Sequence, residues 1–278
     1  MYDLSSESSL RERLPRVSLH SLPPFDAHGP LPAIGYLKGY LEKHRPGICV
    51  TAAYWHQALP RLVRPWSDDR LLSGDGDSCE EFWDAAFALL YLREAAVPDH
   101  RAAEFLEQYG SLFLDTQPRE SFLEVCAGVG AFLEAEAKRL ALETMDIVGA
   151  SVMHRQLIPA LAFLNYVRRR FPAPLTVLGG FPTARDARQI LTAFPFVDIG
   201  VFGDGEQTLL EICDAWRNAA PPNRLAGTVV RRGDEIIENP ARGYVHASEM
   251  GFANYEGFDW GGDREASFLL PICNARGC

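Results

Sequence analysis

The sequence lacks several features that would assign the protein to a membrane or to a secreted fold. None of its 278 residues lie in an apolar run long enough to span a bilayer. The opening MYDLSSESSLRERL is too polar and too acidic for a signal peptide. The six cysteines are scattered, apart from the last two, and do not form the pattern of a disulfide framework. We therefore predict no membrane partner and a location in the reducing cytoplasm.

Positive charge is also scarce. The chain has 27 Lys and Arg against 37 Asp and Glu, which gives a net charge of -10. Binding to a nucleic-acid backbone requires clustered cations. The basic cluster at residues 168–170 ends a predicted helix, where cations interact favourably with the helix dipole. We therefore predict no nucleic-acid partner.

Three common active-site motifs are missing. No GxGxxG follows the first predicted strand, and GDGEQT at residues 203–208 has the wrong third position and follows the last strand of the series. No GxxxxGK loop is present, and Ser151 lacks the GxSxG elbow of a hydrolase. The sequence thus argues against a dinucleotide or phosphate site and against a hydrolytic triad.

Three stretches of the chain share one order of elements, at residues 146–161, 174–184 and 197–212. In each, a short β-branched apolar run is followed by a loop of small or polar residues and then by a helical pattern. This order is typical of βαβ units in a parallel sheet. The loops SVMHRQ, GGFPT and FGDGE are therefore expected at the carboxyl edge, where open α/β sheets bind ligands.

The remaining segments complete this sheet. A first strand is predicted at residues 17–21 and a second in ICVTAAYW, followed by a helical insertion and then by the three βαβ stretches. LAGTVVRRGDEIIEN predicts a hairpin. We predict an α/β fold with a flavodoxin-like, doubly wound parallel sheet of five strands, a helical insertion between strands two and three, and a C-terminal β-hairpin and connector. The predicted segments are a polar tail at 1–16, a main domain at 17–240 with its insertion at about 60–142, and a final segment at 241–278.

Small and polar residues at the ends of these strands are candidates for ligand contacts. Gly179 and Gly180 would let the backbone approach a bulky ligand, or they form only a tight turn. Ser151 would present a hydroxyl to the same edge, or it is an ordinary polar loop residue. Gly203 allows a tight loop, and Glu206 either caps or lines the start of the next helix.

Two histidines follow the first and third predicted strands. His28 and His154 are both expected on the ligand edge, where an imidazole could ligate a metal in a cofactor. Neither has a partner at ligand spacing, so a surface or capping role is the alternative for each.

The ordered set DIVGASVM, TVLGGFPTA and FPFVDIGVFGDGEQTLLEI is similar to the cobalamin-binding domain of cobalamin-dependent radical SAM enzymes. LPPFDAHGPLPAIGYLKGYLEKH resembles that family's opening strand, loop and helix. The resemblance covers residues 17–239 apart from the insertion and implies a Rossmann-like cobalamin-binding domain. It implies that the pocket for the nucleotide tail and corrin is lined by Ser151, Gly179, Gly180, Pro182 and Thr183, with Gly203 and Glu206 at its rim.

The lower axial ligand departs from the pattern of related cobalamin domains. Their DxHxxG motif would place Asp, His and Gly at Asp26, His28 and Leu31, so the final glycine is replaced. Many radical SAM members lack this motif, and the resemblance therefore favours base-off binding without a histidine ligand.

The tail LLPICNARGC resembles the approach to the CxxxCxxC loop of a radical SAM barrel. In that loop three thiolates hold a 4Fe-4S cluster that binds S-adenosylmethionine. Cys278 matches the first thiolate, a metal ligand, whereas Cys273 has the wrong spacing and the other two cysteines are missing. The resemblance implies that residues 241–278 are a linker and the first strand of a truncated barrel, and that this fragment binds cobalamin without catalysing the reaction.

For the whole enzyme, the resemblance implies a methyltransferase that acts on an unactivated carbon of a peptide or small molecule, bound mainly by the barrel. The large insertion suggests the branch that matures ribosomally made peptides. The alternative from a different class is a non-catalytic flavodoxin-like module that binds a nucleotide or a protein partner, since this fold hosts many functions.

Overall fold

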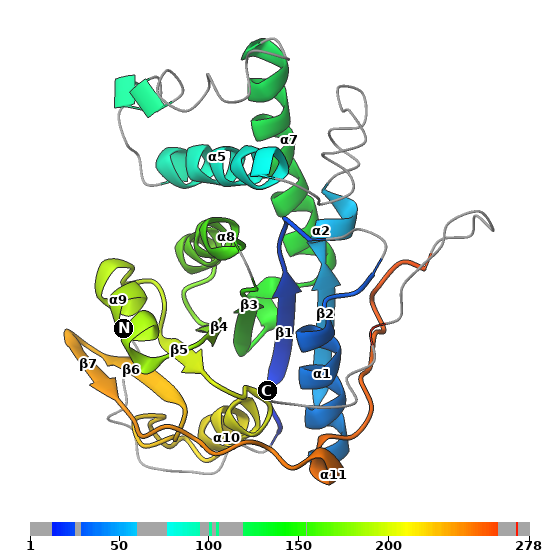
Figure 1. The fold of residues 1–278 in the computed structure, drawn as a ribbon, viewed down its shortest axis with the longest axis vertical. Coiled ribbons are helices and arrows are strands. Elements are labelled where there is room, and N and C mark those ends of the chain that lie inside the picture. The colour runs from blue at the N-terminus through cyan, green and yellow to red at the C-terminus, as the bar shows by residue number, and fades with distance from the viewer. Residues whose placement is uncertain are drawn as a thin grey trace.

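The computed structural model describes residues 13–25, 29–59, 77–94, 100–101, 104–105, 119–153, 155–260 and 271, with the backbone alone at 77–80, 119–122 and 247. Seven strands form one mixed sheet in the order β2-β1-β3-β4-β5-β6-β7 (Figure 1). The parallel strands are β1 (Arg16–Ser21), β2 (Cys49–Tyr54), β3 (Ile147–Ser151), β4 (Leu175–Phe181) and β5 (Ile199–Phe202). This sheet confirms the predicted α/β class.

The five predicted parallel strands and the predicted hairpin are both present, and the hairpin joins the same sheet, which therefore has seven strands. Strands β6 (Thr228–Arg232) and β7 (Glu235–Glu238) pair antiparallel, and β6 pairs antiparallel with β5. Without this pairing, the backbone groups along one side of β5 would lie on an open sheet edge. The hairpin thus covers that edge and extends the sheet beyond its parallel part.

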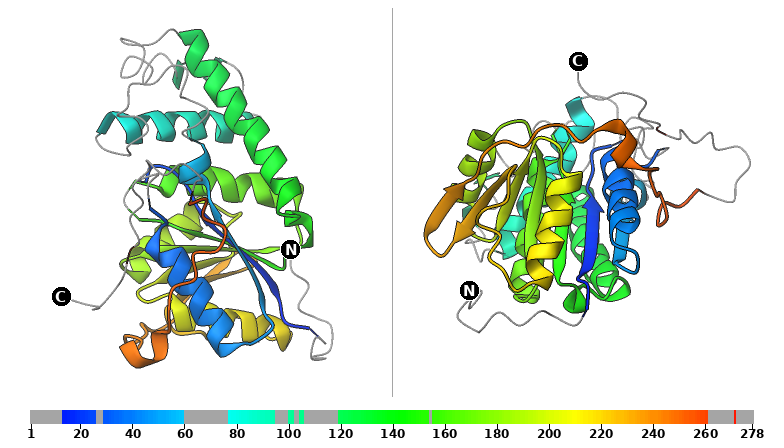
Figure 2. Two further views of the ribbon diagram at one scale, coloured as in Figure 1. Left: turned by 90° about the vertical axis from the view of Figure 1, so that its right-hand side faces the viewer. Right: turned by 90° about the horizontal axis from the view of Figure 1, so that it is seen from below.

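Helices cover both faces of the sheet (Figure 2). Helices α1 (Pro32–His44) and α10 (Glu206–Arg217) pack against each other on one face. Helices α8 (Leu157–Arg170) and α9 (Ala184–Ala193) pack on the other face. Alternate residues of each strand point to opposite faces, so Leu19 and Val177 join the core under α1 and α10, whereas Val148 and Leu178 join the core under α8 and α9. The short elements are α2 (Trp55–Ala58), η1 (Leu142–Thr144) and α11 (Ala247–Met250).

The predicted helical insertion is present as two described helices that extend one core. Helices α5 (Asp77–Glu94) and α7 (Arg119–Arg139) pack against each other, and α5 also packs against α8. Trp83 and Phe87 are fully buried in the same apolar cluster as Phe163 of α8. In Figure 1, α5 lies beyond α8, and α7 runs from this outer end down toward the sheet. Residues 60–76 and most of residues 95–118 of the predicted insertion lie outside the described residues.

The basic cluster at the end of α8 is engaged within the fold. Arg168 forms an ion pair with Asp198. Arg170 pairs with Glu94 at 2.7 Å, and its guanidinium lies over the ring of Tyr166. These contacts join α8 to β5 and to the insertion, so the cluster has a structural role. No helix within the described ranges has both the length and the apolar character needed to cross a bilayer.

Candidate functional site

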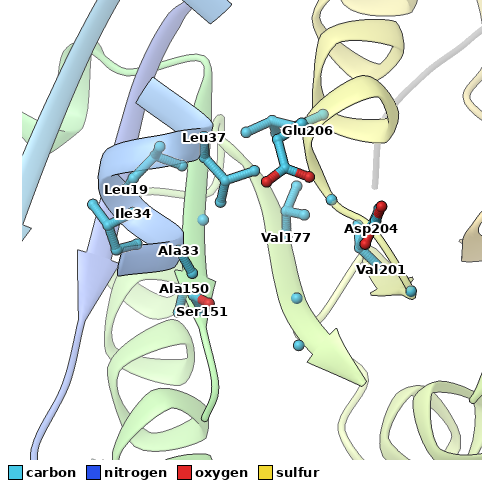
Figure 3. A pocket seen from close by; sticks show the side chains of 16 residues that line it. Leu19, Ala33, Ile34, Leu37, Ala150, Ser151, Val177, Val201, Asp204 and Glu206 are labelled. Atoms are coloured by element: carbon cyan, nitrogen blue, oxygen red, sulfur yellow. The ribbon is translucent and has the colours of Figure 1, made fainter. Parts of the chain in front are cut away.

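A cavity of about 180 Å³ opens at the carboxyl edge of the sheet, between the first turns of α1 and α10 (Figure 3). Both helices begin at this edge. Farther along, Arg45 just after α1 donates from Nε to Oδ1 of Asp214 in α10 at 2.8 Å. The helices are thus joined at their far ends, and the space between them lies at the edge where parallel α/β sheets bind ligands.

The walls of the cavity are apolar. Helix α1 contributes Ala33, Ile34 and Leu37, which recur at helical spacing on the face turned to α10. The sheet contributes side chains from β1, β4 and β5, namely Leu19, Val177 and Val201. Such a surface binds a flat or ring-shaped apolar group by excluding water.

Glycine occupies the two adjacent positions at the end of β4 for different structural reasons. A Cβ on Gly179 would lie 3.8 Å from the nearest heavy atom beyond its chain neighbours, the Cβ of Val201, so a side chain fits and would enter the cavity. Gly180 has φ +102°, and a Cβ there would lie 2.0 Å from the carbonyl oxygen of Val152. Gly180 is thus required by the backbone itself, whereas Gly179 leaves space that a ligand can use.

Acidic side chains stand where the cavity meets α10. Glu206 is the first residue of α10, its side chain is buried, and Figure 3 shows its carboxylate between Leu37 and Val177. Asp204 also lines the cavity, and its Oδ2 accepts from the backbone N–H of Val245 at 3.1 Å. None of the described residues that line the cavity is Lys or Arg. The site therefore suits a neutral group with hydrogen-bond donors better than it suits phosphate.

The structure brings five of the predicted site residues together in the lining of this cavity: Ser151, Gly179, Gly180, Gly203 and Glu206. Pro182 and Thr183 do not line it. Both are exposed, and Thr183 caps α9 by accepting from the N–H of Asp186 at 3.3 Å. His28, His154 and Cys278 lie outside the described residues.

Sequence reasoning missed the contribution of α1. The apolar periodicity of Ile34, Leu37 and Leu41 predicts a helix with a buried face. It does not tell which part of that face lies against the core and which part lines a cavity. Leu41 and Ile34 are both fully buried in the core, but only Ile34 and Leu37 also border the cavity.

Buried polar side chains hold the loops that rim the same edge. The Gln156 amide is fully buried, donates from Nε2 to the carbonyl oxygens of Leu22 at 2.6 Å and Pro24 at 3.1 Å, and accepts from the N–H of Met153 at 2.9 Å. It thereby joins the loop after β1 to the loop after β3. All of its described contacts are to backbone groups, so its role is to set the relative position of two loops.

The cysteine and histidine side chains with strongly shifted pKa values do not line the cavity. Burial raises the pKa of the Cys126 thiol to about 12 and also raises the pKa of the Cys213 thiol. Burial lowers the pKa of His20 to about 3, and this ring lies on the opposite face of the sheet between Trp55 and Phe163. Among the described side chains, no group of three or more His, Cys, Asp or Glu could hold a metal ion.

Comparison with known proteins gives partial matches. No family model matches the chain. It is 31% identical over 111 residues to the anaerobic magnesium-protoporphyrin IX monomethyl ester cyclase of Cereibacter sphaeroides, covering 39% of this chain and 18% of that protein. It is 38% identical over 74 residues to the enzyme of the same name from Synechocystis sp., covering 26% of this chain and 15% of that protein. The chain therefore spans less than a fifth of each curated relative.

Among solved structures, the chain is similar to the cobalamin-dependent S-adenosylmethionine radical enzyme OxsB, solved with aqua-cobalamin and S-adenosylmethionine bound. The TM-score is 0.50 at 15% identity, and the match covers 83% of this chain and 23% of that one. This match shows a shared fold. It confirms the resemblance stated from the sequence, since the structural neighbour is a cobalamin-dependent radical SAM enzyme.

Proposed function

We propose that this chain is the cobalamin-binding part of a cobalamin-dependent radical SAM enzyme. The observation that carries the proposal is the cavity between α1 and α10, which opens beside the glycine-rich ends of β4 and β5. Nothing in this proposal requires the described residues to act as acid, base or nucleophile. Their role is to bind and orient the cofactor.

The shape and chemistry of the edge fit the parts of cobalamin. A corrin is broad and flat, and it needs close approach to backbone, which Gly179 and Gly203 allow. The apolar walls suit the base of the nucleotide tail, and Ser151 and Glu206 offer hydrogen-bonding oxygens to its polar groups. Because the described lining has no Lys or Arg, the phosphate of the tail would stay outside the cavity.

The whole enzyme's chemistry is part of the proposal. When bound, cobalamin would carry a methyl group. The thiolate of Cys278 would be the first ligand of a 4Fe-4S cluster that binds S-adenosylmethionine. We propose a methyltransferase whose substrate is a peptide or small molecule bound mainly outside residues 17–240. Base-off binding, without His28 as an axial ligand, stays part of this proposal.

Two finer features belong to the same proposal. We describe the parallel part of the sheet as flavodoxin-like, which the strand order β2-β1-β3-β4-β5 supports. We also keep the cytoplasm as the location, because the pattern of cysteines suits a reducing compartment.

The rival reading is a non-catalytic module that binds a nucleotide. A helix N-terminus attracts phosphate through its free N–H groups and its dipole. At α10, however, Asp204 and Glu206 place negative charge at this terminus. A phosphate would meet like charges there, which weighs against a nucleotide in this cavity.

The test is uptake of hydroxocobalamin by the purified chain. We expect a changed visible spectrum of the cofactor and its retention through gel filtration. Gly179→Val should weaken uptake at least tenfold without unfolding the protein, since a β-branched residue suits a strand and would fill the cavity. Gly243→Val is the matched control, because Gly243 is exposed and has open space around its Cβ position.

A folded wild-type chain that does not retain hydroxocobalamin would contradict the proposal. Retention of a flavin or adenine nucleotide by that chain, lost in Gly179→Val, would support the rival module. Equal uptake by Gly179→Val and wild type would show that the cofactor binds elsewhere.

A further inference from the structure

The outer face of α1 carries two glycines one turn apart, Gly35 and Gly39. Glycine is unfavourable inside a helix because it loses more backbone freedom on folding than other residues. Glycines at this spacing share one face of the helix. Their contacts show what this face accommodates.

The face seats a segment from the far end of the chain, residues 251–259, which we call the strap. A Cβ on Gly39 would lie 2.0 Å from the carbonyl oxygen of Phe252, and a Cβ on Gly35 would lie 2.2 Å from Cε1 of Tyr255. Between these contacts, the backbone N–H of Asn254 donates to the carbonyl oxygen of Gly35 at 2.9 Å. Any larger residue at either glycine position would displace the strap.

A buried charge joins the strap to α1. The Lys38 side chain is only 3% exposed, and its Nζ lies 2.7 Å from Oε2 of Glu256 and 3.8 Å from Oε1 of Glu42. The Asn254 amide donates to Oε2 of Glu42 at 2.7 Å. A buried ammonium requires ionic partners, because its desolvation is costly. The strap supplies the nearer partner, so lifting it would leave Lys38 with a weaker set of contacts.

The strap continues to the ligand edge of the sheet. Gly257 has φ +100°, and a Cβ there would lie 2.5 Å from the carbonyl oxygen of Ala52 in β2. The ring of Phe258 is buried against Tyr54. The Gln57 side chain makes two hydrogen bonds to the backbone of Asp259. Its Nε2 donates to the Asp259 carbonyl oxygen at 2.5 Å, and its Oε1 accepts from the Asp259 N–H at 3.0 Å. In Figure 1 the strap rises in orange beside α1 to the end of β2.

The same helix walls the cavity with its other face, through Ala33, Ile34 and Leu37. We infer that the docked strap sets the position of this wall, so that docking of the strap and binding in the cavity are coupled. The inference rests on the proposed function only for the identity of the ligand. Coupling of this kind is reciprocal. A change that loosens the strap therefore lowers the affinity for the ligand, and ligand binding favours docking of the strap by the same factor.

The experiment measures amide hydrogen exchange in the full chain, with and without hydroxocobalamin, together with the dissociation constant of hydroxocobalamin. Gly39→Ala should raise the exchange of residues 251–259 and of residues 33–37 in the ligand-free protein. It should raise the dissociation constant of hydroxocobalamin about tenfold, within the range usual for coupled sites. Gly130→Ala is the matched control, since Gly130 is also inside a helix and a Cβ there meets only Cδ1 of Leu90 at 3.7 Å.

A second variant acts from the strap and leaves the sequence of α1 unchanged. Asn254→Ala removes the hydrogen bond to Glu42, and Glu256→Gln in the same protein removes the negative charge that pairs with Lys38. It should raise exchange in residues 33–37 as well as in the strap. This variant also keeps the test decisive if Gly39→Ala fails to fold.

The outcomes separate the two proposals. In the variants, exchange could rise together in the strap and in residues 33–37 while wild type fails to bind hydroxocobalamin. The proposed function would then be wrong, but the inference that the strap positions the cavity wall would be supported. If a variant frees the strap while exchange in residues 33–37 is unchanged, the inference is overturned. Unchanged affinity for hydroxocobalamin in a variant with a freed strap would overturn it as well.

Discussion

Gly180 touches the backbone of Val152 across the ends of two neighbouring strands. Its φ is +102°, and a Cβ at this position would lie 2.0 Å from the carbonyl oxygen and 3.2 Å from the nitrogen of Val152. The pairing of β4 with β5 is irregular at this point, between Gly179 and Phe181. Gly180 thus supplies the positive φ at this irregular position of β4 and leaves room for the backbone of Val152, and it also lines the cavity.

We predict that Gly180→Ala destabilises the fold by about 1–3 kcal/mol, because the added methyl group combines a clash with a backbone conformation that alanine disfavours. Gly179→Ala should change the free energy of unfolding by less than about 0.5 kcal/mol, since its methyl group would make only an ordinary contact with Val201 at 3.8 Å. Urea denaturation of both variants checks this. Equal destabilisation by the two substitutions would contradict the different roles assigned to these glycines.

Gln156→Leu should destabilise the protein by about 3 kcal/mol. The substitution leaves the carbonyl groups of Leu22 and Pro24 and the N–H of Met153 without this partner in a buried setting. Gln189→Leu is the control, because Gln189 is exposed on α9 and its substitution should have little effect. The measurement is the urea midpoint of each variant. A stable Gln156→Leu protein would show that the two loops hold their positions without this amide.

Trp83→Ala should lower the free energy of unfolding by about 3–5 kcal/mol, as expected for loss of a buried tryptophan. Because Trp83 belongs to the same apolar cluster as Phe163, the insertion and the sheet should unfold in one transition. Circular dichroism and tryptophan fluorescence followed through the same denaturation check this. Two separate transitions in wild type would mean that the insertion is an independent unit.

The buried ring of His20 predicts a loss of stability in mild acid. Burial lowers its folded pKa to about 3, so below its ordinary value of 6.5 the unfolded chain binds a proton that the folded chain does not. The stabilisation is fully present above pH 6.5 and falls as pH decreases toward 3. Between pH 7 and pH 5 this one group should cost about 2 kcal/mol.

His20→Phe is the matching variant for this measurement, since an aromatic ring suits the space beside Trp55 and Phe163. Its urea midpoint should decrease less than that of wild type between pH 7 and pH 5. Parallel pH profiles of the two proteins would show that His20 does not carry the acid sensitivity.

Much of the candidate site follows from the order of elements in the sequence. Ser151 and Gly179 are paired neighbours at the ends of β3 and β4, and Gly203 and Glu206 follow β5, as the βαβ pattern predicts. The alternation of apolar strands and helices brings the carboxyl ends of the strands to one edge, and this does not depend on which side chains surround them. The family resemblance, and not this pattern, implies that Thr183 lines the pocket, and the structure instead places Thr183 as the exposed cap of α9.

Other contacts depend on partners that are distant in the chain. The hairpin gives no sign in its own sequence that β6 pairs with β5, because hydrogen bonds between strands are made by the backbone. Gly35 and Gly39 are explained by Phe252 and Tyr255, more than 200 positions away. The position of Gln156 under Leu22 and Pro24 likewise depends on two loops meeting in space.

The sequence by itself determined the alternating strands and helices, and hence that Ser151, Gly179 and Glu206 would share one edge. Local periodicity suffices for this, because it reports which residues lie on the same face of each element. Only the tertiary structure decided that α1 and α10 leave a cavity at that edge, and that the strap supports α1 from outside. Cavities and docked segments arise from how faces pack together, and packing depends on pairs of elements that no local pattern specifies.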